Sequence, residues 1–173
     1  MSAGNFMLYF SRGIVVTGIM FPLIVGAATS ETVNISLTLI SPQPTCNVTV
    51  TPSKDLGALY TGEKRHSVLP VTIACTGTIK SALTAQNLNG GLQTDNYRVS
   101  VPMGSSGAGN GPFLWLQDNN GNNVKLTGAA GDAFCIATDT GRTCNITPVT
   151  SVNSDSGWGS GSVTMRFDIT YPA

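Results

Sequence analysis

Four cysteines are the residues whose type and spacing could most readily do chemistry: Cys46, Cys75, Cys135 and Cys144. Thiolates could hold zinc, but no Cys-x-x-Cys motif occurs and the sequence has one histidine, so a zinc site is not expected. An even number of cysteines in an exported chain favours disulfides, with three connectivities open. We favour Cys46–Cys75 and Cys135–Cys144, because each pair flanks strand-like segments and the second closes a short, turn-rich loop, CIATDTGRTC.

Residues suited to catalysis are scarce. His66 lies in a polar run, GEKRHSVLP, and no Gly-x-Ser-x-Gly motif is present to supply a nucleophile. Seven of the nine acidic residues are Asp, mostly beside the small polar residues of turns. The run DNNGNN, residues 118–123, resembles a calcium loop, but its glycine is fourth and Ala129 stands twelfth, so the EF-hand template fails. The sequence therefore predicts neither an enzyme nor a bound metal or other cofactor.

Two tryptophans could stack on a sugar ring. Trp115 lies in an apolar run, FLWLQ, and is better explained as a core residue. Trp158, in SDSGWGSGS, is the better candidate for an exposed contact.

The first thirty residues have the pattern of an export signal. Residues 1–12 carry one positive charge and no acid, an apolar run too short for a membrane span follows at 14–25, and small residues stand at 26–27. We expect a signal peptide at residues 1–27, with cleavage possible as late as residue 30; a buried helix or an anchor is the alternative. Removal leaves eight basic and nine acidic residues. That balance disfavours nucleic acid and anionic membranes as partners.

The remaining residues predict one all-β domain. Apolar residues rarely recur at helical spacing, and Gly, Asn, Ser and Thr interrupt the chain at short intervals. An Asn-Gly pair at 120–121 predicts a hairpin turn. The expected strands are 33–40, 46–50, 56–60, 67–75, 81–86, 97–103, 113–117, 124–127, 134–137 and 162–171.

Two amphipathic segments stand near the ends of the chain. The first alternates apolar and polar residues, and its apolar face is Val33, Ile35, Leu37 and Leu39. Pro-Gln-Pro follows at 42–44, so no tight hairpin can pair this segment with the next strand. The last segment also alternates, and its apolar face is Val163, Met165, Phe167, Ile169 and Tyr171. Taken alone, that second pattern favours an ordinary edge strand.

The order of these features resembles that of the pilins, the subunits of chaperone–usher pili in Gram-negative bacteria. The resemblance covers essentially the whole mature chain: export signal, alternating extension, PTCNVTV, DLGALY, LPVTIAC and a C-terminal strand that closes near a tyrosine. It implies an incomplete immunoglobulin-like β-sandwich, completed by a donor strand from a neighbouring subunit or a chaperone. It also implies an N-terminal donor-strand extension at 28–45 and a pilin domain at 46–173. The extension most resembles that of type 1 pilus tip subunits.

The resemblance assigns different roles to the two alternating segments. The face of Val33, Ile35, Leu37 and Leu39 matches the side chains that fill the groove of the next subunit. The face of Val163, Met165, Phe167, Ile169 and Tyr171 matches the strand that chaperones bind. The family often has glycine at the position of Leu39, and its tyrosine is usually next to last, whereas two residues follow Tyr171 here. The Cys135–Cys144 bridge is absent from the simplest major pilins.

The implied function is that of a structural subunit, a minor or adaptor pilin contributing to cell adhesion. The implied partners are a periplasmic pilus chaperone, an outer-membrane usher and neighbouring pilin subunits, with export through the periplasm to the surface fimbrium of a Gram-negative bacterium. A one-domain adhesin that binds a host receptor, and a terminating subunit, are the alternatives.

Overall fold

A computed structural model describes residues 36–104 and 110–173 of the chain. The chain divides into two units, Met1–Ile40 and Ser41–Ala173. The described residues of the first unit, 36–40, have no regular secondary structure and are exposed to solvent. Among the described residues, all strands lie in the second unit.

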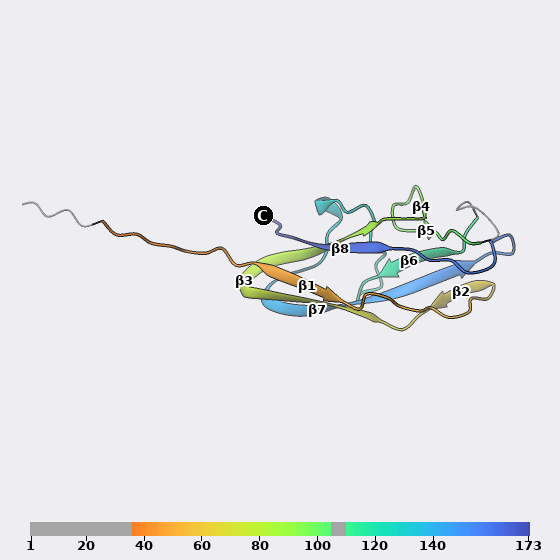
Figure 1. Cartoon of the computed structure of the whole chain (residues 1–173), viewed down its shortest axis with the longest axis horizontal. Helices are drawn as coiled ribbons and strands as arrows, with labels where there is room; N and C mark the ends of the chain where they lie inside the picture. Colours follow the sequence, from red (N-terminus) through yellow and green to blue (C-terminus); the bar gives the residue numbers. More distant parts are fainter. Residues whose placement is uncertain (1–35, 105–109) are drawn as a thin grey trace, which may run out of the picture. The chain divides into compact units, whose positions relative to one another are not determined.

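The second unit is built from antiparallel strands (Figure 1). The strands are β1 (Cys46–Val50), β2 (Gly62–Arg65), β3 (Leu69–Asn87), β4 (Gly91–Leu92), β5 (Val99–Ser100), β6 (Phe113–Gln117), β7 (Phe134–Val152) and β8 (Met165–Thr170). The helical element of the described residues is a short 3-10 turn, Ala130–Asp132. Within residues 36–104 and 110–173, no helix combines the length and the apolar character needed to cross a membrane.

The two longest strands, β3 and β7, organise the sheet. Each has 19 residues, and they pair with one another over two successive stretches. Val71 of β3 pairs with Cys144 of β7 on one side and with Val50 of β1 on the other. The C-terminal part of β7 pairs with β6 and β2, and β5 and β4 continue the sheet beyond β6. All the remaining strands are therefore linked to β3 or β7, either directly or, for β5 and β4, through β6.

The sheet folds over on itself where β3 and β7 turn together, so that two layers face each other (Figure 1). At this bend the register of the pair shifts between Ala74 and Ile79. Gly141 lies in the bend of β7, and a Cβ atom there would lie 2.9 Å from the carbonyl oxygen of Ile73. Because real side chains do not approach a backbone oxygen so closely, the bend requires glycine at this position.

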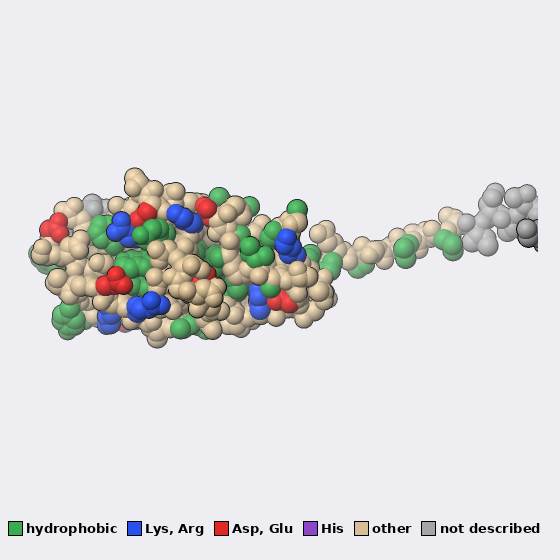
Figure 2. Space-filling model, turned by 180° about the vertical axis from the view of Figure 1, so that it is seen from behind, with side chains coloured by type: hydrophobic (Ala, Val, Ile, Leu, Met, Phe, Trp, Pro, Cys, Tyr) green, Lys and Arg blue, Asp and Glu red, His purple; other side chains and the backbone are tan. Residues whose placement is uncertain are grey.

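Apolar side chains from both layers form the core. The buried cluster consists of Val71, Ile73, Leu83, Ala85, Val99, Leu116, Val124, Leu126, Cys144 and Ile146. Trp115 is also buried, as its apolar surroundings in the sequence predict. On the face drawn in Figure 2, charged side chains are few and scattered among polar and apolar ones.

The strand predictions succeed best where alternation or a short apolar run is contained within a few residues. The strands at 46–50 and 113–117 are confirmed residue for residue. The strand at 124–127 is wrong: only scattered backbone bonds hold this segment, such as Val124 N–H to Leu116 O at 2.9 Å. The strand expected to end at 137 instead runs to Val152, because CIATDTGRTC continues as paired strand along β3 rather than forming a loop.

Both predicted disulfides are confirmed. Cys46–Cys75 joins the first residue of β1 to its partner on β3, and Cys135–Cys144 joins two positions of β7 on either side of its bend. No cysteine of the described residues is free.

The two bridges should contribute unequally to stability. They span sequence separations of 29 and 9 residues, so replacing both cysteines of a pair by serine should cost about 3–4 kcal/mol for Cys46–Cys75 and about 2–3 kcal/mol for Cys135–Cys144. Yield in the periplasm and thermal unfolding of the two double variants measure the difference, each serving as the control for the other. Unchanged yield and melting without Cys46–Cys75 would contradict a supporting role for that bridge.

Candidate functional site

The free edges of β1 and β8 form the candidate site. Leu83 of β3 pairs with Phe134 of β7 on one side and with Ile169 of β8 on the other, so β8 lies on the same edge of β3 as β1. Neither β1 nor β8 has a second strand partner among the described residues. A strand edge without a partner presents a row of backbone N–H and C=O groups that can pair with another strand. We call the free edges of β1 and β8 the open edge.

Apolar side chains lie along the open edge without being fully covered. They pack against the buried core yet remain half-buried: Val48, Val50, Val163, Met165, Phe167 and Ile169. Side chains of this kind are among those most often fully buried in folded proteins. Covering their remaining surface would stabilise a complex by about 25 cal/mol per Å² of apolar area removed from water. The open edge can therefore offer both backbone pairing and apolar contact to a strand.

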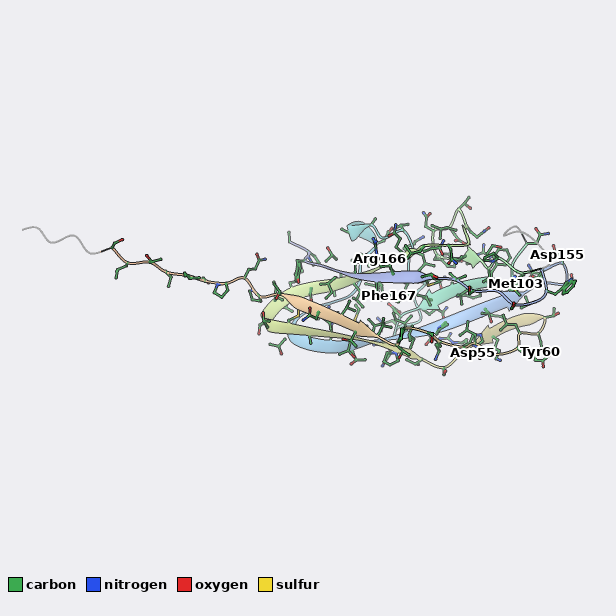
Figure 3. The ribbon with its side chains drawn as sticks, viewed as in Figure 1. Asp55, Tyr60, Met103, Asp155, Arg166 and Phe167 are labelled. Carbon is green, nitrogen blue, oxygen red and sulfur yellow. A yellow bond between two sulfur atoms is a disulfide. The ribbon has the colours of Figure 1, made fainter. Side chains whose placement is uncertain are left out.

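The outward face of β8 is polar. Arg166 and Asp168 form an ion pair, Nε to Oδ2 at 2.7 Å, with side chains that are 57% and 47% exposed. Figure 3 labels Arg166 beside Phe167 on this strand. An exposed pair of this kind contributes between zero and about 1 kcal/mol, so it adds little to the stability of the strand.

Residues 51–60 follow β1 in its layer of the sandwich (Figure 3). The prediction of a strand at 56–60 is wrong, because no strand of the described residues pairs with this backbone. Leu56 and Leu59 are half-buried, whereas Tyr60 is 80% exposed. The segment thus adds two apolar side chains to this layer but no regular hydrogen bonding.

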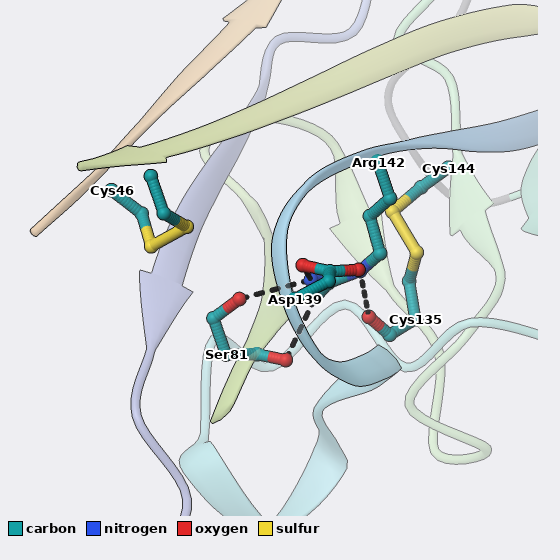
Figure 4. A network of polar contacts seen from close by, with 7 residues as sticks. Cys46, Ser81, Cys135, Asp139, Arg142 and Cys144 are labelled. Atoms are coloured by element: carbon teal, nitrogen blue, oxygen red, sulfur yellow. Dashed lines mark hydrogen bonds and ion pairs between the residues drawn. A yellow bond between two sulfur atoms is a disulfide. The ribbon is translucent and has the colours of Figure 1, made fainter. Parts of the chain in front are cut away.

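Arg142 cross-links the bend of the sheet (Figure 4). Its Nε donates to the carbonyl oxygen of Cys135 at 2.9 Å, and its two terminal nitrogens donate to Ser81 Oγ at 3.0 Å and to Ser81 O at 2.7 Å. Asp139 completes the set with an ion pair at 2.9 Å. These contacts join both arms of β7 to the second half of β3, so the bend end of the sandwich is held by side chains as well as by disulfides.

The C-terminal tail lies at this same end. The hydroxyl of Tyr171, the residue that follows β8, accepts a hydrogen bond from the backbone N–H of Cys46 at 3.0 Å. Lys80 Nζ donates to the carbonyl oxygen of Ala173 at 2.6 Å. β1 and β8 are therefore linked through a side chain at one end, although their backbones do not pair.

The residues expected to act as a donor strand belong to the first unit. Val33 and Ile35 lie outside the described residues. Leu37 and Leu39 are 90% and 92% exposed, and Ile40 is 82% exposed. The described part of this segment therefore leaves its apolar side chains uncovered.

The residues expected to bind a chaperone fall on or beside β8. Met165, Phe167 and Ile169 lie within the strand, Val163 precedes it and Tyr171 follows it. Sequence reasoning did not assign Val48 and Val50 to this site. The alternation in CNVTV could have identified them, but only the pairing of β1 and β8 with one edge of β3 places them there.

Other side chains that could do chemistry have structural contacts. Burial lowers the pKa of His66, and the charges of Lys64 and Lys54 lower it further. The carboxylate of Asp118 accepts hydrogen bonds from backbone N–H groups of its own turn, at 2.8 and 2.9 Å, as turn chemistry predicts. Within the described residues, no group of three or more His, Cys, Asp or Glu side chains is placed to hold a metal ion.

Comparison with solved structures places this fold among pilus proteins. The chain matches a subunit of a chaperone–usher pilus solved to explain rod uncoiling, with a TM-score of 0.52 and 14% identity over 84% of this chain and 97% of that one. It also matches the P pilus rod subunit PapA, with a TM-score of 0.49 and 17% identity over 73% and 99% of the two chains. No family model and no curated protein sequence matches the chain.

The chain has the fold of a chaperone–usher pilus subunit. The prediction of an all-β, immunoglobulin-like pilin fold is therefore confirmed, with a curled antiparallel sheet and, among the described residues, no α-helix. At this level of identity the likeness extends to the fold alone.

Placing charge on the apolar face of β8 should destabilise the domain. Changing Phe167 and Ile169 together to Asp puts two carboxylates against the core, and each should cost more than about 2 kcal/mol because a buried charge lacks a partner there. Periplasmic accumulation and urea unfolding measure the loss. The matched control, Arg166→Gln on the outward face of the same strand, should change stability by less than about 0.5 kcal/mol. Equal behaviour of the two variants would contradict the assignment of faces.

Proposed function

We propose that this chain is a structural subunit of a chaperone–usher fimbria and polymerises by donor-strand exchange. The observation that carries the proposal is the open edge, in a domain whose fold resembles that of a pilus subunit. β8 has paired backbone on one side, unpaired backbone on the other, and half-buried apolar side chains. An added strand would pair with the free backbone groups and cover the apolar side chains. Chaperone–pilin complexes form in this way, which is known as strand addition. This role requires no catalysis and no cofactor.

The N-terminal segment supplies a suitable donor. Its alternating face of Val33, Ile35, Leu37 and Leu39 can enter the open edge of another subunit. At about 1.5–3 kcal/mol for each fully buried side chain, four would contribute about 6–12 kcal/mol. Ordering the segment and bringing two molecules together offset part of that gain, while backbone pairing adds to it.

Within a fimbria, we assign the chain the role of a minor or adaptor pilin that contributes to cell adhesion. Its extension resembles that of type 1 pilus tip subunits, and its second disulfide is absent from the simplest major pilins. Its partners are a periplasmic chaperone, an outer-membrane usher and neighbouring pilins. Its place is the surface fimbrium of a Gram-negative bacterium, reached through the periplasm.

A one-domain adhesin is the second candidate function. Trp158 favours it, because its side chain is 78% exposed in a glycine- and serine-rich loop and could stack on a sugar. Glycan or host-cell binding by the purified subunit, lost in Trp158→Ala, would favour the adhesin. A subunit that accepts no donor strand from a further neighbour, and is recovered only at the base of fibres, would instead be a terminator.

Supplying a donor strand within the same chain should stabilise the domain. We expect a copy of residues 31–40, fused after Ala173 through a flexible Gly/Ser linker, to give a soluble monomer with a melting temperature at least about 10 °C above that of the unmodified mature chain, since several apolar side chains become covered. A fusion with Leu37→Asp and Leu39→Asp in the added copy is the control and should gain little. An unmodified chain that is monomeric and equally stable would oppose the proposal.

Removing the donor should separate folding from assembly. A chain lacking residues 31–40 should fold and be captured by the chaperone, because β8 is intact, but should not insert into another subunit. Co-purification with the chaperone and recovery in sheared fibres measure the two steps. The control, Ser36→Ala with Thr38→Ala on the polar face of the segment, should retain both. Internal incorporation of the deletion variant into fibres would show that another segment is the donor.

A further inference from the structure

Tyr171 occupies the end of the open edge that lies beside the bend of the sheet. Its backbone continues from β8, yet its hydroxyl is hydrogen-bonded to Cys46, the first residue of β1, at 3.0 Å. The ring therefore reaches from the end of one edge strand to the beginning of the other. Its side chain remains 44% exposed, so the contact lies at the surface rather than inside the core.

The N–H group that Tyr171 binds belongs to the free side of β1. The preceding pair, Thr45 and Thr76, is bonded across the ladder: Thr76 N–H donates to Thr45 O at 2.9 Å, and Thr45 N–H donates to Thr76 Oγ1 at 3.0 Å. Bonded and non-bonded pairs alternate in antiparallel sheets, so Cys46 and its partner Cys75 form a non-bonded pair. The N–H of Cys46 consequently points away from β3, toward the space that a strand at the open edge would enter.

A second contact fixes the tail that carries Tyr171. Lys80, on β3 beside the bend, donates to the carbonyl oxygen of Ala173 at 2.6 Å. Tyr171 is thus held on both sides, by β8 before it and by the Lys80 contact after it. The same two-residue period that turns Cys46 N–H outward also turns the N–H groups of Val48 and Val50 outward. Tyr171 covers the first of these donors.

We propose that Tyr171 is the end stop of the open edge and sets the register at which an inserted strand comes to rest. A strand that extended past this point would have to break the hydrogen bond to Cys46 and displace the ring. A strand that ends before it keeps the bond and leaves the outward groups of Val48 and Val50 available. This inference rests on the proposed function and names a residue that selects among donor strands by length and register.

Peptide exchange tests the end stop. The mature chain, purified with its chaperone, is mixed with synthetic peptides of residues 31–40, 29–40 or 31–42, and release of chaperone is followed over time. For the natural chain, one of the two longer peptides should exchange about two- to tenfold more slowly than 31–40, the range of one net hydrogen bond. Tyr171→Phe should remove that difference. Tyr60→Phe, at an exposed tyrosine near the end of the sandwich opposite the bend (Figure 3), is the matched control and should retain it.

Hydrogen exchange supplies a readout that does not depend on peptide length. In the chain complemented with peptide 31–40, exchange of the Cys46 amide should be about two- to tenfold faster in Tyr171→Phe and unchanged in Tyr60→Phe. The end stop alone is overturned if exchange of the Cys46 amide is unchanged in Tyr171→Phe. It is also overturned if the natural chain shows no preference for peptide length, or if Tyr171→Phe keeps that preference. Failure of every peptide to replace the chaperone on the natural chain overturns the proposed function itself.

Discussion

Backbone groups at the edge of a β-sheet need hydrogen-bond partners, and β8 meets this need on one side only. Its inner side pairs with β3 from Ala82 to Asn87, while its outer side has no strand partner among the described residues. The apolar side chains that alternate along it are half-buried for the same reason, since no further strand covers them. Unpaired backbone and uncovered apolar surface coincide along one line, which is the arrangement that strand addition completes.

The bend of β3 and β7 creates this edge. If β3 ran straight, β1 and β8 would follow one another along the same side of a single sheet. Because the sheet folds over, the two strands instead belong to facing layers, with their free edges on the same side of the sandwich. The close approach at Gly141 allows the bend, and the contacts of Arg142 with Ser81, Cys135 and Asp139 hold it. The contacts that hold the bend thus lie at one end of the open edge.

The contacts at the bend end bear on the position at which an added strand could come to rest. The bend end is cross-linked by two disulfides, by Arg142 and by the Tyr171 hydroxyl, and under the proposal made above it would form a fixed boundary. Along the rest of the open edge, backbone pairing contributes affinity without regard to sequence, and the spacing of apolar side chains selects the face that a strand presents. A boundary at one end would add a third criterion, which is register. Register is poorly specified by backbone pairing alone, because every shift by two residues keeps the same face.

Elements that depend on local pattern could be predicted from the sequence. Alternation located β1 and β8, the apolar run located β6, and the strand-like segments flanking each pair of cysteines favoured both bridges, because each of these signals is contained within a few neighbouring residues. Local pattern could not predict that CIATDTGRTC is strand, that 56–60 is not, or that Val48 and Val50 lie on the same open edge as β8. These outcomes depend on which backbone lies alongside: β3 supplies hydrogen bonds to a stretch of β7 that is rich in turn residues, whereas nothing among the described residues supplies them to 56–60. A strand is a property of two segments, and a single sequence pattern describes one of them.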